Sequence, residues 1–213
     1  MNCCSAKGCE EFFSERVARR SARAYRRRGL APEGRRIVEL VRRRGVHGET
    51  VLEVGGGIGA IQIELVRAGA ERATNVELSA AWEPYADELL REKAVAERVE
   101  RRVLDFAARP GEVETADVVV LQRVVCCYPD YNTLVGCAAD HARKQLVLTF
   151  PRDVLLMRTG IRAVNLVQRL RRRAFRVYLH KPAAIVAVAE SRGLRTTTRE
   201  QRRFWELAEF ARE

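Results

Sequence analysis

A chain of 213 residues, 47% hydrophobic and 31% charged, has the composition of one globular domain, expected here over residues 1–213, and is too short for two domains joined by a linker. No apolar run reaches the roughly 18–20 residues that cross a bilayer, and the N-terminus lacks the pattern of a secretory signal, so we expect a cytoplasmic protein. The net charge of +11 is uneven, because residues 1–50 and residues 151–180 each carry +7 and the remainder is negative.

Two amphipathic helices are expected before residue 50. Residues 10–28 place an apolar stripe that includes Tyr25 opposite seven arginines. A second helix is expected over residues 32–44, because this segment starts with a proline and is followed by glycines. We predict that the two helices form an N-terminal cap over residues 1–48.

From residue 50 onward, short apolar runs alternate with helical stretches, which is typical of a parallel sheet covered by helices on both faces. A basic amphipathic helix at 153–171 interrupts the alternation. The pattern predicts an α/β fold in which strands and helices alternate over 49–150, followed by a helix and a C-terminal hairpin over 151–213. The expected strands are 51–54, 73–77, 99–104, 118–121, 145–150, 194–203 and 205–211, and the other expected helices are 58–68, 80–97, 132–143 and 182–191.

The run Glu53-Val54-Gly55-Gly56-Gly57-Ile58-Gly59 joins an apolar strand to a helix. Glycines in such a turn allow positive φ and let the backbone approach a nucleotide-like ligand closely. The next strand ends at Glu77, 22 residues after Gly55, where a carboxylate can accept hydrogen bonds from two ribose hydroxyls. The turn also satisfies the looser fingerprint of NAD-binding proteins, so by itself it leaves two cofactors open.

Further residues favour S-adenosylmethionine, and with them residues 50–211 resemble the class I S-adenosylmethionine-dependent methyltransferases. These enzymes carry an acid two positions before the first glycine, matched by Glu53, and an acid after the third strand, matched by Asp105 with Phe106 beside it. The resemblance implies a Rossmann-like, seven-stranded, mostly parallel sheet with an antiparallel last strand, and S-adenosyl-L-methionine as cofactor. It also implies a cofactor-binding half over 49–150 and a lid helix and C-terminal hairpin over 151–213. The implied cofactor-binding residues are Glu53, Gly55, Gly56, Gly57, Glu77, Leu78, Asp105, Phe106, Gln122 and Arg123.

A closer resemblance, to the magnesium-protoporphyrin IX O-methyltransferase group, lies in residues 121–130 and 149–152 and in the two N-terminal helices. That group commonly has a histidine before its Tyr-Pro pair, where this chain has Cys127. It also has an N-terminal tyrosine that closes over the site, for which Tyr25 is the best match. Together with one further histidine, the candidate catalytic residues are Tyr25, Cys127, Tyr128 and His180.

The acceptor is expected to be small and acidic, because the two arginine-rich blocks fall where class I enzymes place the variable covers of the acceptor pocket. An ionised carboxylate needs no general base, and positioning supplies much of the acceleration, so carboxylate O-methylation is favoured. His180, just before a helix start, is either a base or, as we favour, a capping neighbour. Candidate clamps for the acceptor are Arg23, Arg26, Arg152 and Arg158.

Two alternatives stay open. A nucleic-acid methyltransferase would bind phosphates through its arginines, but the chain has no Asn/Asp-Pro-Pro-Tyr motif and no appended nucleic-acid-binding module, so nucleic acid is not an expected partner. A non-catalytic protein with this fold would instead use the helix at 153–171 for peripheral membrane contact. The apolar positions of that helix that are spaced for one face are Val154, Met157, Ile161, Val164 and Val167.

Six cysteines fall in two clusters that have neither the distribution of a disulfide framework nor the spacing of a zinc site. We therefore expect reduced thiols and no bound metal, although contact between the clusters would allow a soft metal. The clusters are Cys3, Cys4 and Cys9, and Cys126, Cys127 and Cys137. The oligomeric state is not predicted by the sequence.

Overall fold

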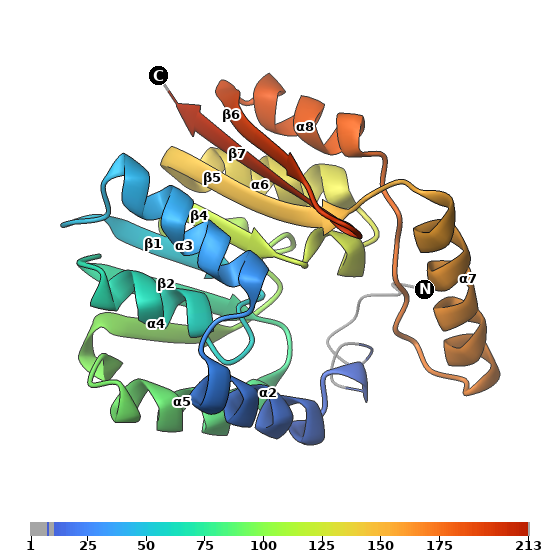
Figure 1. Ribbon diagram of the computed structural model, residues 1–213, viewed down its shortest axis with the longest axis horizontal. Coiled ribbons are helices and arrows are strands. Elements are labelled where there is room, and N and C mark those ends of the chain that lie inside the picture. The colour runs from blue at the N-terminus through green and yellow to red at the C-terminus, as the bar shows by residue number, and fades with distance from the viewer. Residues whose placement is uncertain (1–7, 9–10, 213) are drawn as a thin grey trace.

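One sheet of seven strands forms the centre of the computed structural model, which describes Gly8 and residues 11–212 (Figure 1). The strand order is β3-β2-β1-β4-β5-β7-β6. β7 pairs antiparallel with β5 and β6, and the other neighbouring strands pair in parallel. The expected Rossmann-like sheet with an antiparallel last strand is confirmed. The strands are β1 (Thr50–Val54), β2 (Arg72–Glu77), β3 (Val99–Val103), β4 (Ala116–Gln122), β5 (Ala142–Pro151), β6 (Leu194–Gln201) and β7 (Trp205–Arg212).

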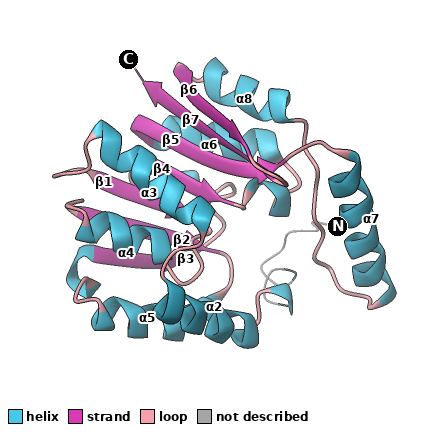
Figure 2. Cartoon of the chain, viewed as in Figure 1, coloured by secondary structure: helices cyan, strands magenta, loops and turns pink. Residues whose placement is uncertain are grey.

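Helices cover both faces of the sheet, and each face has its own core (Figure 2). Successive residues of a strand point to opposite faces. In β4, Val118 and Val120 therefore join the core under α2 to α5, whereas Val119 and Leu121 join the core under α6 and α8. These helices are α2 (Glu15–Arg28), α3 (Pro32–Arg44), α4 (Ala60–Arg67), α5 (Glu83–Glu92), α6 (Tyr131–His141) and α8 (Pro182–Ser191).

Two helices are much shorter than the sequence pattern predicts. The helix expected from residue 10 begins at Glu15, because Ser14 is extended, with φ −72° and ψ 165°. The helix expected over 80–97 ends at Glu92, because Ala94 takes a left-handed conformation with φ 54°. Short 3-10 turns replace its two ends. The β-strand that follows, β3, therefore starts where it was predicted.

α7 (Leu155–Leu170) interrupts the alternation as expected. Its one buried residue is Gln168, and of the apolar positions predicted to share one face, Met157 and Ile161 are half-buried whereas Val164 and Val167 are exposed. In Figure 1 the helix stands apart from the sheet and lies along the segment that leads to α8. Among the residues that the structure describes, no helix is long and apolar enough to span a membrane.

Candidate active site

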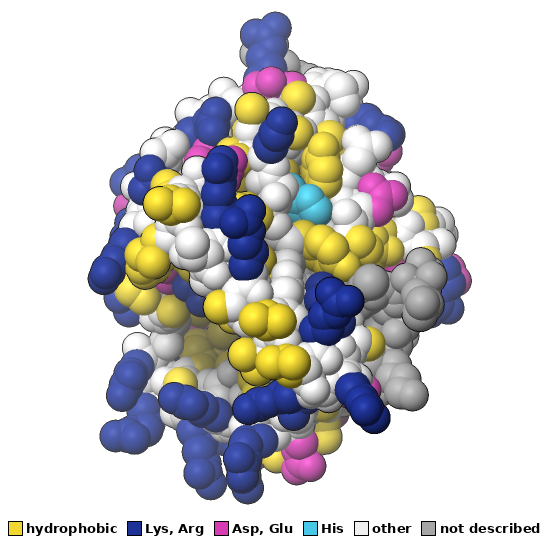
Figure 3. Space-filling model, turned by 90° about the vertical axis from the view of Figure 1, so that its right-hand side faces the viewer, with side chains coloured by type: hydrophobic (Ala, Val, Ile, Leu, Met, Phe, Trp, Pro, Cys, Tyr) yellow, Lys and Arg dark blue, Asp and Glu magenta, His cyan; other side chains and the backbone are white. Residues whose placement is uncertain are grey.

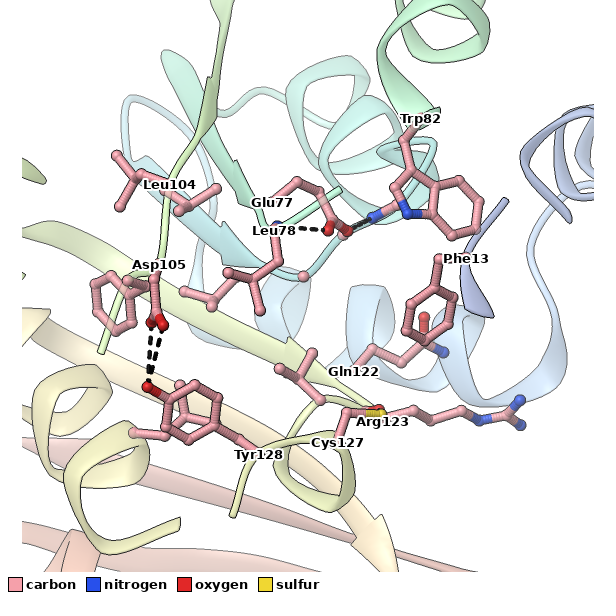
Figure 4. A pocket seen from close by; sticks show the side chains of 18 of the residues that line it. Phe13, Glu77, Leu78, Trp82, Leu104, Asp105, Gln122, Arg123, Cys127 and Tyr128 are labelled. Atoms are coloured by element: carbon pink, nitrogen blue, oxygen red, sulfur yellow. Dashed lines mark hydrogen bonds between the residues drawn. The ribbon is translucent and has the colours of Figure 1, made fainter. Parts of the chain in front are cut away.

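A cavity of about 350 Å³ opens at the carboxyl ends of β1, β2 and β4, where open α/β sheets place their ligand sites (Figure 4). Its wall comes from the turn after β1, the end of β2, the loops after β3 and β4, and the segment before α2. Cys127 and Tyr128 line the cavity, whereas Tyr25, His180 and Glu53 do not. The other predicted cofactor-binding residues all line it, namely Gly55, Gly56, Gly57, Glu77, Leu78, Asp105, Phe106, Gln122 and Arg123.

The turn after β1 has no room for side chains at two of its glycines. Gly55 has φ +67°, and its N–H donates to the carbonyl oxygen of Val76 at 2.7 Å. A Cβ on Gly55 would lie 2.5 Å from Cγ2 of Val124, and a Cβ on Gly56 would lie 2.1 Å from Nδ2 of Asn75. The glycines therefore allow the turn to pack tightly against the protein, and where they line the cavity the backbone itself forms the wall.

Glu77 ends β2 and directs its carboxylate toward the glycine turn. Oε1 accepts a hydrogen bond from the N–H of Gly57 at 2.5 Å, and Oε2 accepts one from the N–H of Leu78 at 3.0 Å (Figure 4). Burial raises the pKa of Glu77, and these amide donors oppose the rise. A carboxylate oxygen has two lone pairs, so Glu77 retains acceptor capacity for a ligand in the cavity.

Glu53 lies beneath the turn instead of in the cavity wall. Its Oε2 accepts a hydrogen bond from the N–H of Gln62 at 3.2 Å, and burial raises its pKa to about 8 against the opposing effect of that bond. The side chains of Gln62 and Asn75 are buried in the same layer, where Arg101 donates to the carbonyl oxygen of Gly57 at 2.8 Å. Glu53 thus belongs to a polar layer that supports the turn from below.

Asp105 opens the loop after β3 and is held by three donors. Its Oδ1 accepts hydrogen bonds from the N–H groups of Ala107 and Ala108 at 3.1 and 3.2 Å, and the hydroxyl of Tyr128 donates to the same carboxylate (Figure 4). Phe106 is almost fully buried and packs edge-on against His141, with 5.0 Å between ring centroids. The loop therefore presents a fixed carboxylate beside an aromatic ring.

Arg123 follows β4 with φ +59°, a conformation that few non-glycine residues adopt. Its N–H donates to Oγ1 of Thr149 at 2.8 Å, which fixes the start of the loop. Its guanidinium pairs with Glu33 at 3.0 Å and lies over the ring of Trp205, 4.7 Å from the centroid. The side chain is thereby anchored to α3 and β7 at the rim of the cavity.

Two cysteines follow β4, and their sulfurs contact each other and the backbone. The sulfur of Cys127 donates to the carbonyl oxygen of Arg123 at 3.6 Å and lies 3.9 Å from the sulfur of Cys126. This contact lowers the pKa of the buried Cys126 thiol, against the effect of burial. The predicted N-terminal cluster lies outside the described residues, as it consists of Cys3, Cys4 and Cys9.

Tyr25 and His180, two of the candidate catalytic residues, lie behind the cavity wall. Tyr25 is buried and its hydroxyl donates to Glu64 at 2.6 Å, and burial together with this acidic partner raises its pKa. Nε2 of His180 lies 2.9 Å from the carbonyl oxygen of Tyr128, and partial burial lowers the pKa of the imidazole. Tyr25 does not line the cavity, so no contact in this structure supports its predicted role in closing the site. His180 contacts the backbone of the loop after β4.

The four candidate arginine clamps do not line the cavity in the described chain. Arg26 pairs with Glu92 at 2.7 Å, and Arg158 pairs with Asp153 at 2.6 Å. Arg152 donates to the side chain of Gln201 at 2.9 Å, and Arg23 is exposed on α2. These arginines therefore face neighbouring elements or solvent.

Two aromatic residues of the cavity wall were missed by the sequence reasoning. Phe13 comes from the segment before α2, and Trp82 from the turn that precedes α5, with 5.9 Å between their ring centroids (Figure 4). Phe13 also packs edge-on against Phe175, 5.5 Å away. The position of Trp82, five residues after Glu77 in a loop at the site edge, was the available signal.

The family comparison covers the part of the chain that builds most of this cavity. Residues 52–147 match the profile of the family described as "Methyltransferase domain". Residues 52–147 thus carry a methyltransferase domain. The matched range includes the glycine turn, Glu77, Asp105 and the loop after β4, and it leaves α2, α3, α7 and the C-terminal hairpin outside.

Solved structures are similar over the methyltransferase domain and beyond it. The magnesium protoporphyrin IX methyltransferase of Synechocystis PCC 6803 with bound SAH is 21% identical, with a TM-score of 0.70 over 85% of this chain and 82% of that one. Geranyl diphosphate C-methyltransferase from Streptomyces coelicolor A3(2) is 14% identical, with a TM-score of 0.65 over 83% and 78%. The O-methyltransferase family 2 protein from Planctomyces limnophilus is 16% identical, with a TM-score of 0.66 over 93% and 62%.

At these identities the solved structures establish the class I methyltransferase fold for the chain. The methyltransferase domain together with this fold confirms the predicted enzyme class and its cofactor, S-adenosyl-L-methionine. The glycine turn, which by its sequence also fitted NAD, therefore belongs to a methyltransferase domain.

Proposed function

We propose that this methyltransferase acts on a small acidic acceptor, with a carboxylate oxygen as the favoured acceptor atom. The observation that carries the proposal is the cavity at the strand ends, which Glu77, Asp105 and Arg123 line together with the glycine turn. When bound there, S-adenosyl-L-methionine supplies a methyl group activated by its sulfonium. The residues of this chain bind the cofactor, hold the acceptor in line and exclude water.

The proposed cofactor contacts follow from the donors and acceptors in the wall. Glu77 accepts hydrogen bonds from the ribose hydroxyls with the lone pairs that Gly57 and Leu78 leave free. Asp105 accepts a hydrogen bond from the adenine amino group. The backbone of Gly55, Gly56 and Gly57 faces the cofactor directly, because these residues line the cavity and have no side chain.

The remaining predicted cofactor-binding residues are proposed to act by packing or at a distance. Leu78 and Phe106 supply apolar surface to the cavity wall, and Gln122 contributes a polar side chain from the end of β4. Glu53 has no access to the cavity, so it acts by fixing the turn above it.

Arg123 supports the assignment of an acidic acceptor. Within the described chain, it is the one lysine or arginine in the cavity wall, and it takes the place of the four clamps proposed from the sequence. Its guanidinium is paired with Glu33. The carboxylate of an acceptor would replace Glu33 and accept hydrogen bonds from the same guanidinium N–H groups. Similar enzymes are named after small molecules, magnesium protoporphyrin IX and geranyl diphosphate, which supports a small-molecule acceptor.

An ionised carboxylate reacts without a general base, so the candidate catalytic residues are proposed to position the acceptor. Cys127 and Tyr128 would contact it from the loop after β4. His180 holds the carbonyl of Tyr128 and would act through that loop. Tyr25 would act only if α2 moved, because its hydroxyl is bound to Glu64.

Titration calorimetry with S-adenosylmethionine, S-adenosylhomocysteine and NAD tests the cofactor site. We expect Glu77→Ala to weaken binding of both sulfur compounds at least about tenfold, since hydrogen bonds to a charged group are lost. Glu71→Ala, an exposed acid just before β2, is the matched control and should bind like the wild type. Binding of NAD alone, or equal affinities for Glu77→Ala and Glu71→Ala, would contradict the proposed site.

A labelled methyl group tests the acceptor atom. Methyl esters release methanol in mild base, whereas methyl ethers and N-methyl groups do not. Incubation with methyl-labelled S-adenosylmethionine and a panel of small acids should therefore give base-labile, volatile label, and Arg123→Gln should raise KM for the acid more than it lowers kcat. Base-stable label, or label on neutral acceptors alone, would refute carboxylate methylation while leaving the cofactor site intact.

A further inference from the structure

α7 exposes its apolar side chains to solvent. Leu155 and Leu170 are each 75% exposed, and Leu156, Leu166, Val164 and Val167 are between 42% and 62% exposed. A surface helix of a globular domain normally buries its apolar face, which supplies most of its stability. The apolar surface of α7 is therefore available to a partner.

The exposed apolar residues share one half of the helix. With about 100° between successive residues, Leu155, Leu166 and Leu170 lie within one stripe, beside Leu156 and Val167. No charged residue of α7 falls in this half. The opposite side contacts the rest of the protein through the half-buried or buried residues Met157, Ile161, Asn165 and Gln168.

Arginines flank the apolar half. Arg158, Arg162 and Arg169 form a row along one edge of it, and Arg171, Arg172 and Arg173 follow the last turn, all of them exposed. Figure 3 views the side of the molecule that carries α7 and shows hydrophobic side chains next to arginines and lysines there. In residues 151–180, Asp153 is the single acidic residue among eight arginines.

We propose that α7 lies in the surface of an anionic phospholipid membrane, with its leucines between the acyl chains and its arginines on the lipid phosphates. An outward apolar face bordered by cations is the pattern of interfacial helices. A two-fold dimer through the same face would bring two arginine-rich segments together, because an isologous contact pairs a patch with itself. The leucines would find no role on a nucleic acid, whose surface is formed by phosphates.

The docked helix is tied to the candidate active site. Asn165 exchanges two side-chain hydrogen bonds with the backbone of Val177, at 2.7 and 2.9 Å, so α7 is fixed to the segment that follows it. Phe175 in that segment packs against Phe13, which lines the cavity. A membrane that holds α7 would therefore lie next to one wall of the cavity. This placement is independent of the acceptor proposed above.

Co-sedimentation with vesicles tests the proposal on the full chain. We expect binding to vesicles of phosphatidylcholine mixed with phosphatidylglycerol, and at least about tenfold weaker binding to phosphatidylcholine alone at physiological ionic strength. Leu166→Ser with Leu170→Ser should weaken binding to the mixed vesicles at least tenfold. Arg162→Gln with Arg169→Gln should weaken binding to the mixed vesicles by about the same factor and should make that binding less dependent on salt.

Matched controls separate these effects from general loss of apolar surface or charge. Val103→Ser removes an exposed apolar residue at the far sheet edge, and Arg27→Gln with Arg28→Gln removes two exposed arginines of α2. Both controls should bind vesicles like the wild type. The substituted side chains of α7 are exposed, so the leucine and arginine variants of α7 should keep the wild-type unfolding midpoint.

Three results would overturn the proposal. The first is no binding to the mixed vesicles. The second is binding that the leucine variant leaves unchanged, which would indicate only attraction of arginines to any polyanion, including RNA. The third is a dimer in sedimentation velocity that the leucine variant dissociates, which would assign the face of α7 to a second copy of the chain.

Discussion

The hydroxyl of Tyr128 donates to both carboxylate oxygens of Asp105, at 3.2 and 3.3 Å. The proposed adenine amino group would donate to the same carboxylate. Because two backbone amides hold Asp105 in place without help, we expect the hydroxyl to compete with the cofactor. Tyr128→Phe should therefore tighten binding of S-adenosylhomocysteine about fivefold by calorimetry, a change of about 1 kcal/mol.

Tyr131→Phe is the control for that measurement, because Tyr131 begins α6 outside the cavity wall. It should bind S-adenosylhomocysteine like the wild type. Weaker binding by Tyr128→Phe would instead mean that the hydroxyl helps to hold the Asp105 carboxylate for the ligand.

Gly55→Ala should destabilise the fold and impair cofactor binding. The new Cβ would meet Val124 at 2.5 Å and would sit at φ +67°. Gly29→Ala is a matched control, because Gly29 has φ +65° with nothing within 4 Å of its Cβ position. In urea unfolding we expect about 1–3 kcal/mol lost for Gly29→Ala, whose ψ of −156° lies in a region that glycine alone favours, and about 1–3 kcal/mol more for Gly55→Ala from overpacking.

Adding Val124→Ala to Gly55→Ala should recover part of the lost stability, since it removes the clashing methyl groups. Equal losses for the two glycine variants, with no recovery in the double variant, would show that the tight contact at Val124 does not constrain the turn.

The sequence-predicted residues that line the cavity are those at or just after strand ends. Glu77 and Asp105 line the cavity because the carboxyl ends of parallel strands meet at one edge, and the sequence pattern locates strand ends well. Phe13 reaches the same cavity from a segment whose path depends on tertiary packing, so neither periodicity nor spacing indicated it, whereas the spacing of Trp82 from Glu77 was a usable signal. Tyr25 depends on tertiary packing in the same way. Its helix was predicted from the sequence, but Glu64, which accepts the hydrogen bond from its hydroxyl, was not.

The outward face of α7 was also beyond the sequence pattern. Periodicity located a basic amphipathic helix, and the structure forms one at Leu155–Leu170. Apolar residues occupy more than one side of this helix, so the pattern could not decide whether Met157 and Ile161 or the leucines face the protein. The contacts with Val177 and the segment after α7 decide it.

Glu53→Gln should change how stability depends on pH. The folded protein raises the carboxyl pKa from its ordinary value of 4.5 to about 8, because burial disfavours the charged form. Between these values the folded state keeps a proton that the unfolded state releases, so this group's contribution is full below pH 4.5 and is lost as pH rises toward 8. Glutamine mimics the protonated form at every pH.

The unfolding free energy of Glu53→Gln, measured in urea from pH 5 to 9, should therefore fall less steeply with pH than that of the wild type, and the variant should be the more stable protein above pH 8. Glu100→Gln, an exposed acid on β3, should keep the wild-type slope. Parallel profiles for Glu53→Gln and the wild type would mean that Glu53 is already ionised in the folded protein.

Tyr25→Phe distinguishes a structural from a functional role for the N-terminal tyrosine. The hydroxyl of Tyr25 donates to Glu64 at 2.6 Å in a partly buried site, so its removal should cost about 1 kcal/mol of stability. Tyr85→Phe, which removes an exposed hydroxyl bound to Glu15 at 2.8 Å, should cost less. Because Tyr25 lies behind the cavity wall, kcat and KM for methyl transfer should change less than about twofold in both variants. A drop in kcat for Tyr25→Phe alone, with KM and stability unchanged, would instead assign Tyr25 to a closed state in which α2 moves over the site, as the resemblance to the magnesium-protoporphyrin group implies.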